Sequence, residues 1–352
     1  MTAALILKSD DWPTLHRQRF DAMFAEGDIL DGRGLAYHWS TGSRRKRMQS
    51  YGHWLAFLRR TERLDFRADP ARLFSPEGVA AFVADTEARI SRKSTSMQVE
   101  DLLVIARHLA PDEDWSWFKK LSHRLRNSVG PHQLKPRAGV SARDLFEWSQ
   151  QQMAKWRDEA SRRVSAAQRF RDGLSVGLLI ARPLRVRTFV NLSIGRQLQR
   201  PPSGFVLRLD ASDMKNRRAR EYPVPKQLNG SLAFYISEVR PVLLRDAQSE
   251  RLWISQSGCP MSIDSFTSNL ANLTKREFDE ALRPHAFRRI AATSIAIEDP
   301  EHVGIVAELL GHTTLAMAEK HYNQARGVEA IATYQRLLQD MRSTHHAKRR
   351  SR

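Results

Sequence analysis

One segment near the middle of the chain, NSVGPHQLKPRAGV at residues 127–140, limits what this protein can fold into. It contains two prolines and two glycines and shows no apolar periodicity, which is typical of a linker. Only helical patterns precede it, whereas the patterns after it are mixed. The sequence therefore predicts two domains of different architecture, and a chain of 352 residues is long enough for both.

The first half is predicted to be a bundle of short helices over residues 41–126. In SRRKRMQSYGHWLAFLRR, apolar residues recur with helical spacing at Met48, Tyr51 and Leu55, and Ser43 is a candidate N-cap. Similar patterns occur in SPEGVAAFVADTEARI, STSMQVEDLLVIARHL and DEDWSWFKKLSHRL. Residues 1–40 have no clear pattern, and we assign them no role.

The second half, residues 141–342, is predicted to be helical around one small antiparallel sheet. A long helical run begins at Ser141. Short pieces with strand character follow, LSIGRQLQ, GFVLRLD and REYPVP, separated by PPSG and by the basic turn SDMKNRRA. Helical patterns then resume, and a basic tail at residues 343–352 ends the sequence. The predicted fold class is mainly α, with a helical N-terminal domain and an α+β C-terminal domain.

The charge of the chain indicates its partner. Lys and Arg number 57 against 39 Asp and Glu, a net charge of +18. Such an excess attracts polyanions, of which nucleic acid is the usual one, although a merely basic surface is the plainer alternative. No apolar run reaches the roughly 18 residues of a membrane span, the N-terminus is a poor signal peptide, and the single Cys259 allows no internal disulfide. We therefore expect a cytoplasmic protein.

Basic residues gather at the start of the first predicted helix, in the linker and in the basic turn. At a helix N-terminus, positive charge opposes the helix dipole and does not stabilise the helix. Binding of DNA phosphates would explain the basic residues there. The alternative is that they form a flexible, solvated arm. The candidate DNA-binding residues are Arg44, Arg45, Lys46, Arg47, Lys135, Arg137, Arg217 and Arg218.

Four stretches of the second half contain residues that suit a phosphate group. They are ARPLRVRTFVNL with Arg185, SDMKNRRAR with Lys215, RPHAFRR with His285 and Arg288, and LLGHTTLAMAEKHYNQA with His312 and Tyr322. His285 and Arg288 are three residues apart, so they share a helix face. Each stretch alone also has a plainer interpretation: a surface arginine, a turn lysine, a polar helix start, a helix C-cap or a half-buried aromatic.

Taken in this order, the stretches resemble the tyrosine recombinase, or phage integrase, family. LRVRTFVNL resembles its first arginine box, HAFRR its His-x-x-Arg box, and LLGH the second-histidine box before the nucleophilic tyrosine. The resemblance covers about residues 140–330, and the first half resembles less specifically the family's core-binding (SAM-like) domain. Thr188 replaces the usual Glu of the first box, and Tyr322 follows His312 at an interval one residue longer than the commonest.

The resemblance implies DNA strand cleavage through a 3′-phosphotyrosyl intermediate, without a metal or cofactor. The implied roles are attack by Tyr322, binding of the phosphate oxygens by Arg185 and Arg288, protonation of the leaving oxygen by Lys215, proton transfer by His285 and a phosphate hydrogen bond from His312.

Integration or transposition of a mobile element is the biological role that we expect from the resemblance. The resemblance implies double-stranded DNA as the partner and a tetramer on that DNA. Other recombinase subunits or accessory DNA-bending proteins are possible further partners. The expected place of action is the bacterial nucleoid. The C-terminal helix over residues 328–341 would pack in trans or in cis. Chromosome dimer resolution uses the same chemistry and stays open as a biological role. Two alternative functions also stay open: a type IB topoisomerase-like relaxing enzyme, and a decayed integrase that only binds DNA.

Overall fold

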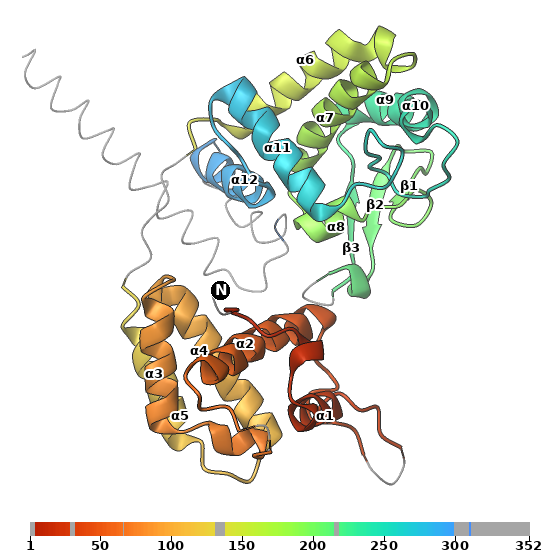
Figure 1. Ribbon diagram of the computed structural model, residues 1–352. Coiled ribbons are helices and arrows are strands. Elements are labelled where there is room, and N and C mark those ends of the chain that lie inside the picture. The colour runs from red at the N-terminus through yellow and green to blue at the C-terminus, as the bar shows by residue number, and fades with distance from the viewer. Residues whose placement is uncertain are drawn as a thin grey trace, which may run out of the picture. The chain divides into compact units, whose positions relative to one another are not determined.

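The protein forms two compact units, Met1–Lys135 and Pro136–Arg352, in a computed structural model (Figure 1). The structure describes residues 4–28, 32–65, 67–130, 138–214, 218–298 and Leu310. The first unit is helical, and the second combines helices with one small antiparallel sheet. These two architectures confirm the predicted fold class.

Serine side chains begin three of the helices in the first unit. Ser75 and Ser91 each accept a hydrogen bond from the backbone N–H three residues on, at 3.0 and 3.3 Å. The predicted cap Ser43 is wrong: the cap is Ser40, whose hydroxyl accepts from the N–H of Ser43 at 3.2 Å. The sequence placed the cap too late because the first turn of the helix is polar and shows no apolar periodicity. The elements are η1 (Ser9–Asp11), α1 (Thr14–Ala22), α2 (Thr41–Arg60), η2 (Pro70–Leu73), α3 (Pro76–Glu87), α4 (Arg92–Leu109) and α5 (Ser116–Asn127).

Aromatic residues dominate the core of this first unit. Trp54 of α2 stacks on Phe74 with ring centroids 5.3 Å apart and meets Phe82 of α3 edge to face at 5.4 Å. Trp12 and Phe20 are also buried in this cluster. The segment before α2, to which the sequence assigned no role, thus contributes a helix and part of the core.

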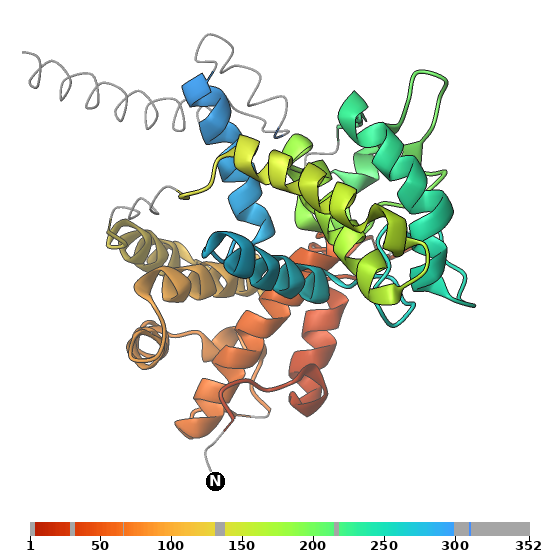
Figure 2. The ribbon, with the colours of Figure 1, turned by 90° about the horizontal axis from the view of Figure 1, so that it is seen from above.

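The second unit begins with two helices where the sequence indicated one run. Ser141 and Asp144 form a reciprocal capping box at the start of α6. The run ends at Ala160 and restarts as α7, and the two helices lie side by side (Figures 1 and 2). The elements up to the sheet are α6 (Ala142–Ala160), α7 (Val164–Ala181) and α8 (Val186–Val190).

The sheet has three antiparallel strands in the order β1-β2-β3. They are β1 (Leu198–Gln199), β2 (Val206–Leu209) and β3 (Arg220–Pro223), with the short helix η3 (Ala211–Asp213) after β2. Leu207 of β2 pairs with Leu198 and with Tyr222. Along β2, Leu207 and Leu209 are buried while Arg208 between them is exposed, so one face packs on the core.

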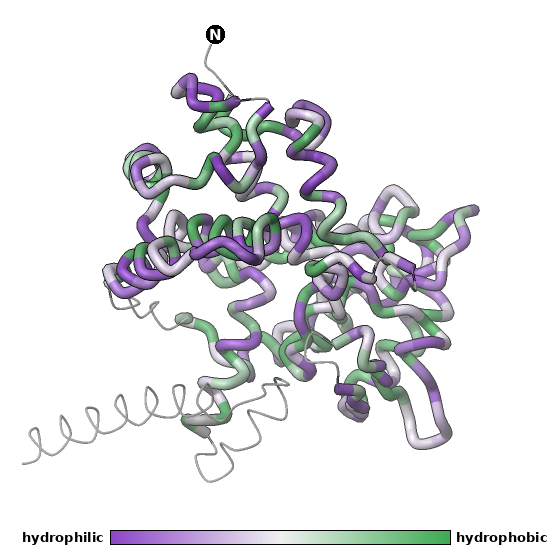
Figure 3. The backbone as a smooth tube through the Cα atoms, turned by 90° about the horizontal axis from the view of Figure 1, so that it is seen from below, coloured by the Kyte–Doolittle hydropathy of each residue, from purple (hydrophilic) through white to green (hydrophobic). Residues whose placement is uncertain are grey.

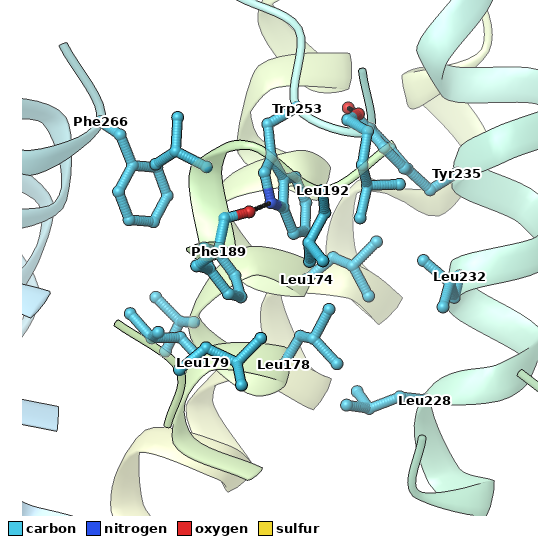
Figure 4. Packing of buried hydrophobic residues seen from close by; sticks show 14 of the residues in the cluster. Leu174, Leu178, Leu179, Phe189, Leu192, Leu228, Leu232, Tyr235, Trp253 and Phe266 are labelled. Carbon is cyan, nitrogen blue, oxygen red and sulfur yellow. Dashed lines mark hydrogen bonds between the residues drawn. The ribbon is translucent and has the colours of Figure 1, made fainter. Parts of the chain in front are cut away.

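Helices complete the second unit and enclose its core. They are α9 (Lys226–Phe234), the π-helix η4 (Tyr235–Val239), α10 (Arg240–Leu244), α11 (Ile263–Phe278) and α12 (Pro284–Glu298). Trp253 stacks on Phe189 of α8 with centroids 5.1 Å apart and donates its indole N–H to the Phe189 carbonyl at 2.9 Å (Figure 4). This pair fixes the short helix α8 against the core.

Hydrophobic and hydrophilic stretches alternate along the helices of both units, as expected for helices with one buried face (Figure 3). No helix within the described part of the chain is both long and apolar enough to cross a membrane.

Candidate active site

Arg185 lies at the junction between α7 and α8. It is the N-cap of α8, with extended backbone angles, and its side chain is half-buried. Phe189 and Val190 of the same helix are buried. Because the apolar side of α8 is held in the core, Arg185 is carried at the edge of that core on a fixed backbone.

Arg288 of α12 ties this junction to a second, distant segment. Its guanidinium is buried and donates to the main-chain carbonyl of Pro183, two residues before Arg185. A second nitrogen of the group donates to the Leu310 carbonyl at 2.6 Å. Leu310 is itself buried and precedes His312 by two residues in the sequence. One guanidinium therefore joins the first arginine box to the LLGH box.

The electrostatics of this cluster favour an anion. Burial, and next the positive charge of Arg185, lower the pKa of Arg288 to about 10, while Tyr222 acts in the opposite direction. Two guanidiniums that feel one another's charge in a partly desolvated place are stabilised by a negative ligand. A phosphate, with several acceptor oxygens, matches the planar donor pattern of arginine.

His285 lies in the first turn of α12, whose first residue is Pro284, a residue that helices tolerate at this position. The side chain of His285 is exposed, whereas Arg288 one turn later is buried. Helix α12 thus carries the imidazole of His285 at the surface and the guanidinium of Arg288 in the interior.

Outside the described residues lie Lys215, His312 and Tyr322, the DNA-binding candidates Lys135, Arg137 and Arg217, and residues 328–352. Their roles stay predictions.

Tyr222 and Thr188 join the cluster without having been singled out as functional in the sequence. Tyr222 on β3 influences the pKa of both Arg182 and Arg288. Thr188 donates its hydroxyl to the Asp213 carbonyl at 3.0 Å, which links α8 to the turn after β2. No motif marks a tyrosine in a short strand, but the departure from the family's Glu at Thr188 was a signal for closer attention.

The basic cluster at the start of α2 has partners within its own unit. Arg44 pairs with Asp21 at 3.2 Å and lies over the Phe24 ring, with 4.1 Å to its centroid. Lys46 pairs with the buried Asp101 at 3.0 Å.

Arg47 lies over Trp39, with 3.9 Å to the ring centroid, and approaches Asp101 at 3.8 Å. These contacts supply a structural reason for positive charge at the start of α2. Arg45 and Arg218 are exposed. DNA contact by any of these residues stays a prediction.

Metal-binding side chains do not gather in the described ranges: no group there of three or more His, Cys, Asp or Glu could hold a metal ion. Cys259 is free and exposed.

Comparison with known proteins gives one family match. The model of the phage integrase family matches residues 147–327, which is more than half of the chain. Tyrosine recombinase XerC of Alcanivorax borkumensis is 31% identical over 106 residues, 30% of this chain and 34% of the relative. Tyrosine recombinase XerD of Staphylococcus aureus is 26% identical over 151 residues, 43% of this chain and 49% of the relative. The matches thus span between a third and a half of these curated relatives.

Two solved structures share the fold. Both are of the site-specific recombinase XerH, one bound to its difH substrate before cleavage and one bound to a palindromic difH substrate after cleavage. The first has a TM-score of 0.52 at 16% identity and covers 86% of this chain and 80% of its own. The second has a TM-score of 0.54 at 13% identity and covers 95% and 100%.

Proposed function

Because the chain belongs to the phage integrase family, we propose that it is a site-specific DNA recombinase that cleaves and rejoins strands through a tyrosine-linked intermediate. The phenol oxygen of Tyr322 attacks the scissile phosphorus, a 3′-phosphotyrosyl bond forms, and the bond to the 5′ oxygen breaks. Attack by a 5′-hydroxyl of another strand reverses these steps. The energy of the phosphodiester is kept throughout, so rejoining consumes no nucleotide cofactor.

The surrounding residues each have one task in this chemistry. Arg185 and Arg288 bind the non-bridging oxygens, on which negative charge grows in the transition state. Lys215 gives the leaving 5′ oxygen its proton, and His285 takes part in proton transfer at the nucleophile. His312 donates a hydrogen bond to the phosphate.

The observation that carries the proposal is the buried guanidinium of Arg288. It lies within the electrostatic influence of Arg185, and its hydrogen bonds reach the segments that lead into Arg185 and His312. A phosphate clamp needs this arrangement, because its donors must be fixed before the substrate arrives. A merely structural arginine would not require a second cation nearby.

Double-stranded DNA is the partner in this proposal, and the net charge of +18 supports it. We propose a tetramer that recombines two sites, with integration or transposition of a mobile element as its use and the bacterial nucleoid as its place of action. The site-specific recombinase XerH, which shares the fold, is described as bound to its difH substrate.

Covalent capture tests the proposal. Labelled duplexes that tile the genomic DNA on both sides of the protein's own gene are incubated with the protein and denatured in SDS. Wild type is expected to retain label on one or a few duplexes, and Tyr322→Phe to retain none while still shifting the same duplexes in native gels. Tyr334→Phe changes the next tyrosine in the sequence and is therefore the matched control. It is expected to behave as wild type.

The other outcomes separate the alternatives. No adduct with wild type on any fragment, despite binding, would identify a protein that only holds DNA. Adducts on every fragment, with relaxation of supercoiled plasmid by the monomer, would identify a topoisomerase-like enzyme. An adduct that survives in Tyr322→Phe would show that another residue is the nucleophile.

A further inference from the structure

Tyr222 lies on the face of β3 that packs on the core. It pairs with Leu207 of β2, which is fully buried, and residues paired across antiparallel strands share one face of the sheet. The side chain of Tyr222 is half-buried and packs against the core of the second unit, as do Ala181 at the end of α7 and Val186 of α8. Glu221, on the opposite face of β3, is exposed. The phenol is therefore on the same side of the sheet as the junction of α7 and α8.

A hydrogen bond joins β3 directly to that junction. The Nε–H of Arg182 donates to the main-chain carbonyl of Pro223, the residue next to Tyr222, at 2.9 Å. Arg182 precedes Arg185 by three residues, and Arg288 donates to a carbonyl of the same short segment. The main chain beside Tyr222 is thus fixed to the segment that leads into Arg185.

The phenol of Tyr222 is also close enough to two guanidiniums to influence both. Burial, the largest cause, lowers the pKa of Arg182 and of Arg288, and Tyr222 acts in the opposite direction on each. A guanidinium carries hydrogens to donate and has no acceptor, so neither arginine can accept the hydrogen of a phenol. An anion held by the arginines supplies acceptor oxygens at this place.

We propose that Tyr222 donates its hydroxyl hydrogen to a non-bridging oxygen of the scissile phosphate, an inference that rests on the proposed function. Tyr222 is then a catalytic residue beside Arg185 and Arg288, and the nucleophile is still Tyr322. The phenol forms no covalent bond and keeps its proton. Negative charge grows on the non-bridging oxygens in the transition state, so this hydrogen bond strengthens as the reaction proceeds. Its loss is expected to slow cleavage by about 10-fold to 100-fold.

The test changes one oxygen of the phosphate at a time. Single-turnover cleavage is measured on a duplex that forms the covalent adduct, and on its two phosphorothioate diastereomers at the scissile position. Each diastereomer has sulfur in place of a different non-bridging oxygen. Sulfur is a weak hydrogen-bond acceptor, so each diastereomer weakens the hydrogen bonds to one of the two positions.

Tyr222→Phe removes the hydroxyl and keeps the ring. It is expected to be slow on the ordinary duplex and on one diastereomer. On the other diastereomer, where sulfur replaces the oxygen that the phenol binds, its rate is expected to approach that of wild type. Tyr235→Phe is the matched control, because it removes a buried hydroxyl of the same unit that donates to the Leu252 carbonyl at 2.9 Å. It is expected to cleave all three duplexes at the wild-type rates.

Two results would overturn the inference alone. They are a wild-type rate for Tyr222→Phe on the ordinary duplex, and an equal loss on all three duplexes, which indicates a structural role. No adduct with wild type on any duplex would overturn the proposed function and this inference with it.

Discussion

The two units use clustered positive charge in opposite ways. At the start of α2, Arg44 and Lys46 pair with the carboxylates of Asp21 and Asp101. At the junction of α7 and α8, Arg288 donates to two main-chain carbonyls, which have no net charge, and its pKa is lowered by burial and by Arg185. The first arrangement pairs its cations with carboxylates, and in the second one guanidinium lies within the electrostatic influence of another.

We expect this difference to separate structural basic residues from those that bind phosphate. A cation that meets a carboxylate of its own unit stabilises the fold, and its removal is felt as lost stability. A buried cation close to another cation gains stability from an anionic ligand. The sequence shows only that basic residues cluster at the start of α2 and in the candidate active site. The partners of each cation in the structure then indicate whether it stabilises the fold or is available to bind an anion.

The largest effect is expected at Arg288. Arg288→Lys keeps the charge and loses the planar set of donors, so adduct formation in single turnover is expected to fall by about 100-fold to 1000-fold. Arg44→Lys is the matched exchange in the first unit, and its cleavage rate is expected to stay at the wild-type value. Equal losses in the two variants would remove the distinction between the clusters.

The next largest effect concerns the buried carboxylate of the first unit. Asp101 contacts Lys46, Arg47 and Ser50, and Asp101→Asn is expected to lower the free energy of unfolding by about 2 kcal/mol, since the cations are partly exposed. Asp21→Asn breaks an exposed pair and is expected to change it by less than about 0.5 kcal/mol. Segment-resolved hydrogen exchange of the full chain measures both; similar losses of protection in α2 would contradict the account.

The buried His16 makes the stability of the first unit depend on pH. His16 is buried, its Nδ1 lies 2.8 Å from the Tyr51 hydroxyl, and burial lowers its pKa from 6.5 to about 4. The unfolded chain therefore binds a proton between these values while the folded chain does not. The contribution of neutral His16 to the free energy of unfolding is fully present above pH 6.5. This contribution is expected to fall by on the order of 2 kcal/mol as the pH decreases to 4. His16→Gln should remove this part of the pH dependence of urea unfolding; an unchanged profile would mean that other groups cause it.

The smallest effect is expected from Arg45, which is exposed on α2. If it contacts a DNA phosphate, Arg45→Ala reduces the slope of log affinity against log salt by about one. Arg44→Ala, whose side chain pairs with Asp21, is expected to change this slope less. Titrations of labelled duplex at several salt concentrations decide between them, and wild-type slopes for both variants would place neither residue at the phosphates.

The sequence predicted the architecture because its signals are local. Helical spacing and strand character depend on near neighbours, so helices α2 to α5 and the three strands were found. The role of the first residues was missed because Trp12 and Phe20 are buried by contacts with distant segments. The unusual start of α2 was misjudged because its polar first turn has no periodicity.

The candidate site could be predicted by motif but not by geometry. Arg185 and Arg288 are candidates because of their boxes, and their catalytic roles stay predictions, whereas the carbonyl partners of Arg288 are 105 and 22 residues away in the chain. The contact of Thr188 with Asp213 crosses 25 residues and belongs to no motif. Such contacts follow from tertiary packing, which spacing along the chain does not encode.

Peptide mapping of the covalent adduct tests the central claim most directly. The captured protein–DNA complex is digested with nuclease and trypsin, and the modified peptide is sequenced by mass spectrometry. The account predicts a 3′-linked nucleotide on Tyr322. A nucleotide on Tyr222, which influences the pKa of Arg288, or on His321 would contradict it.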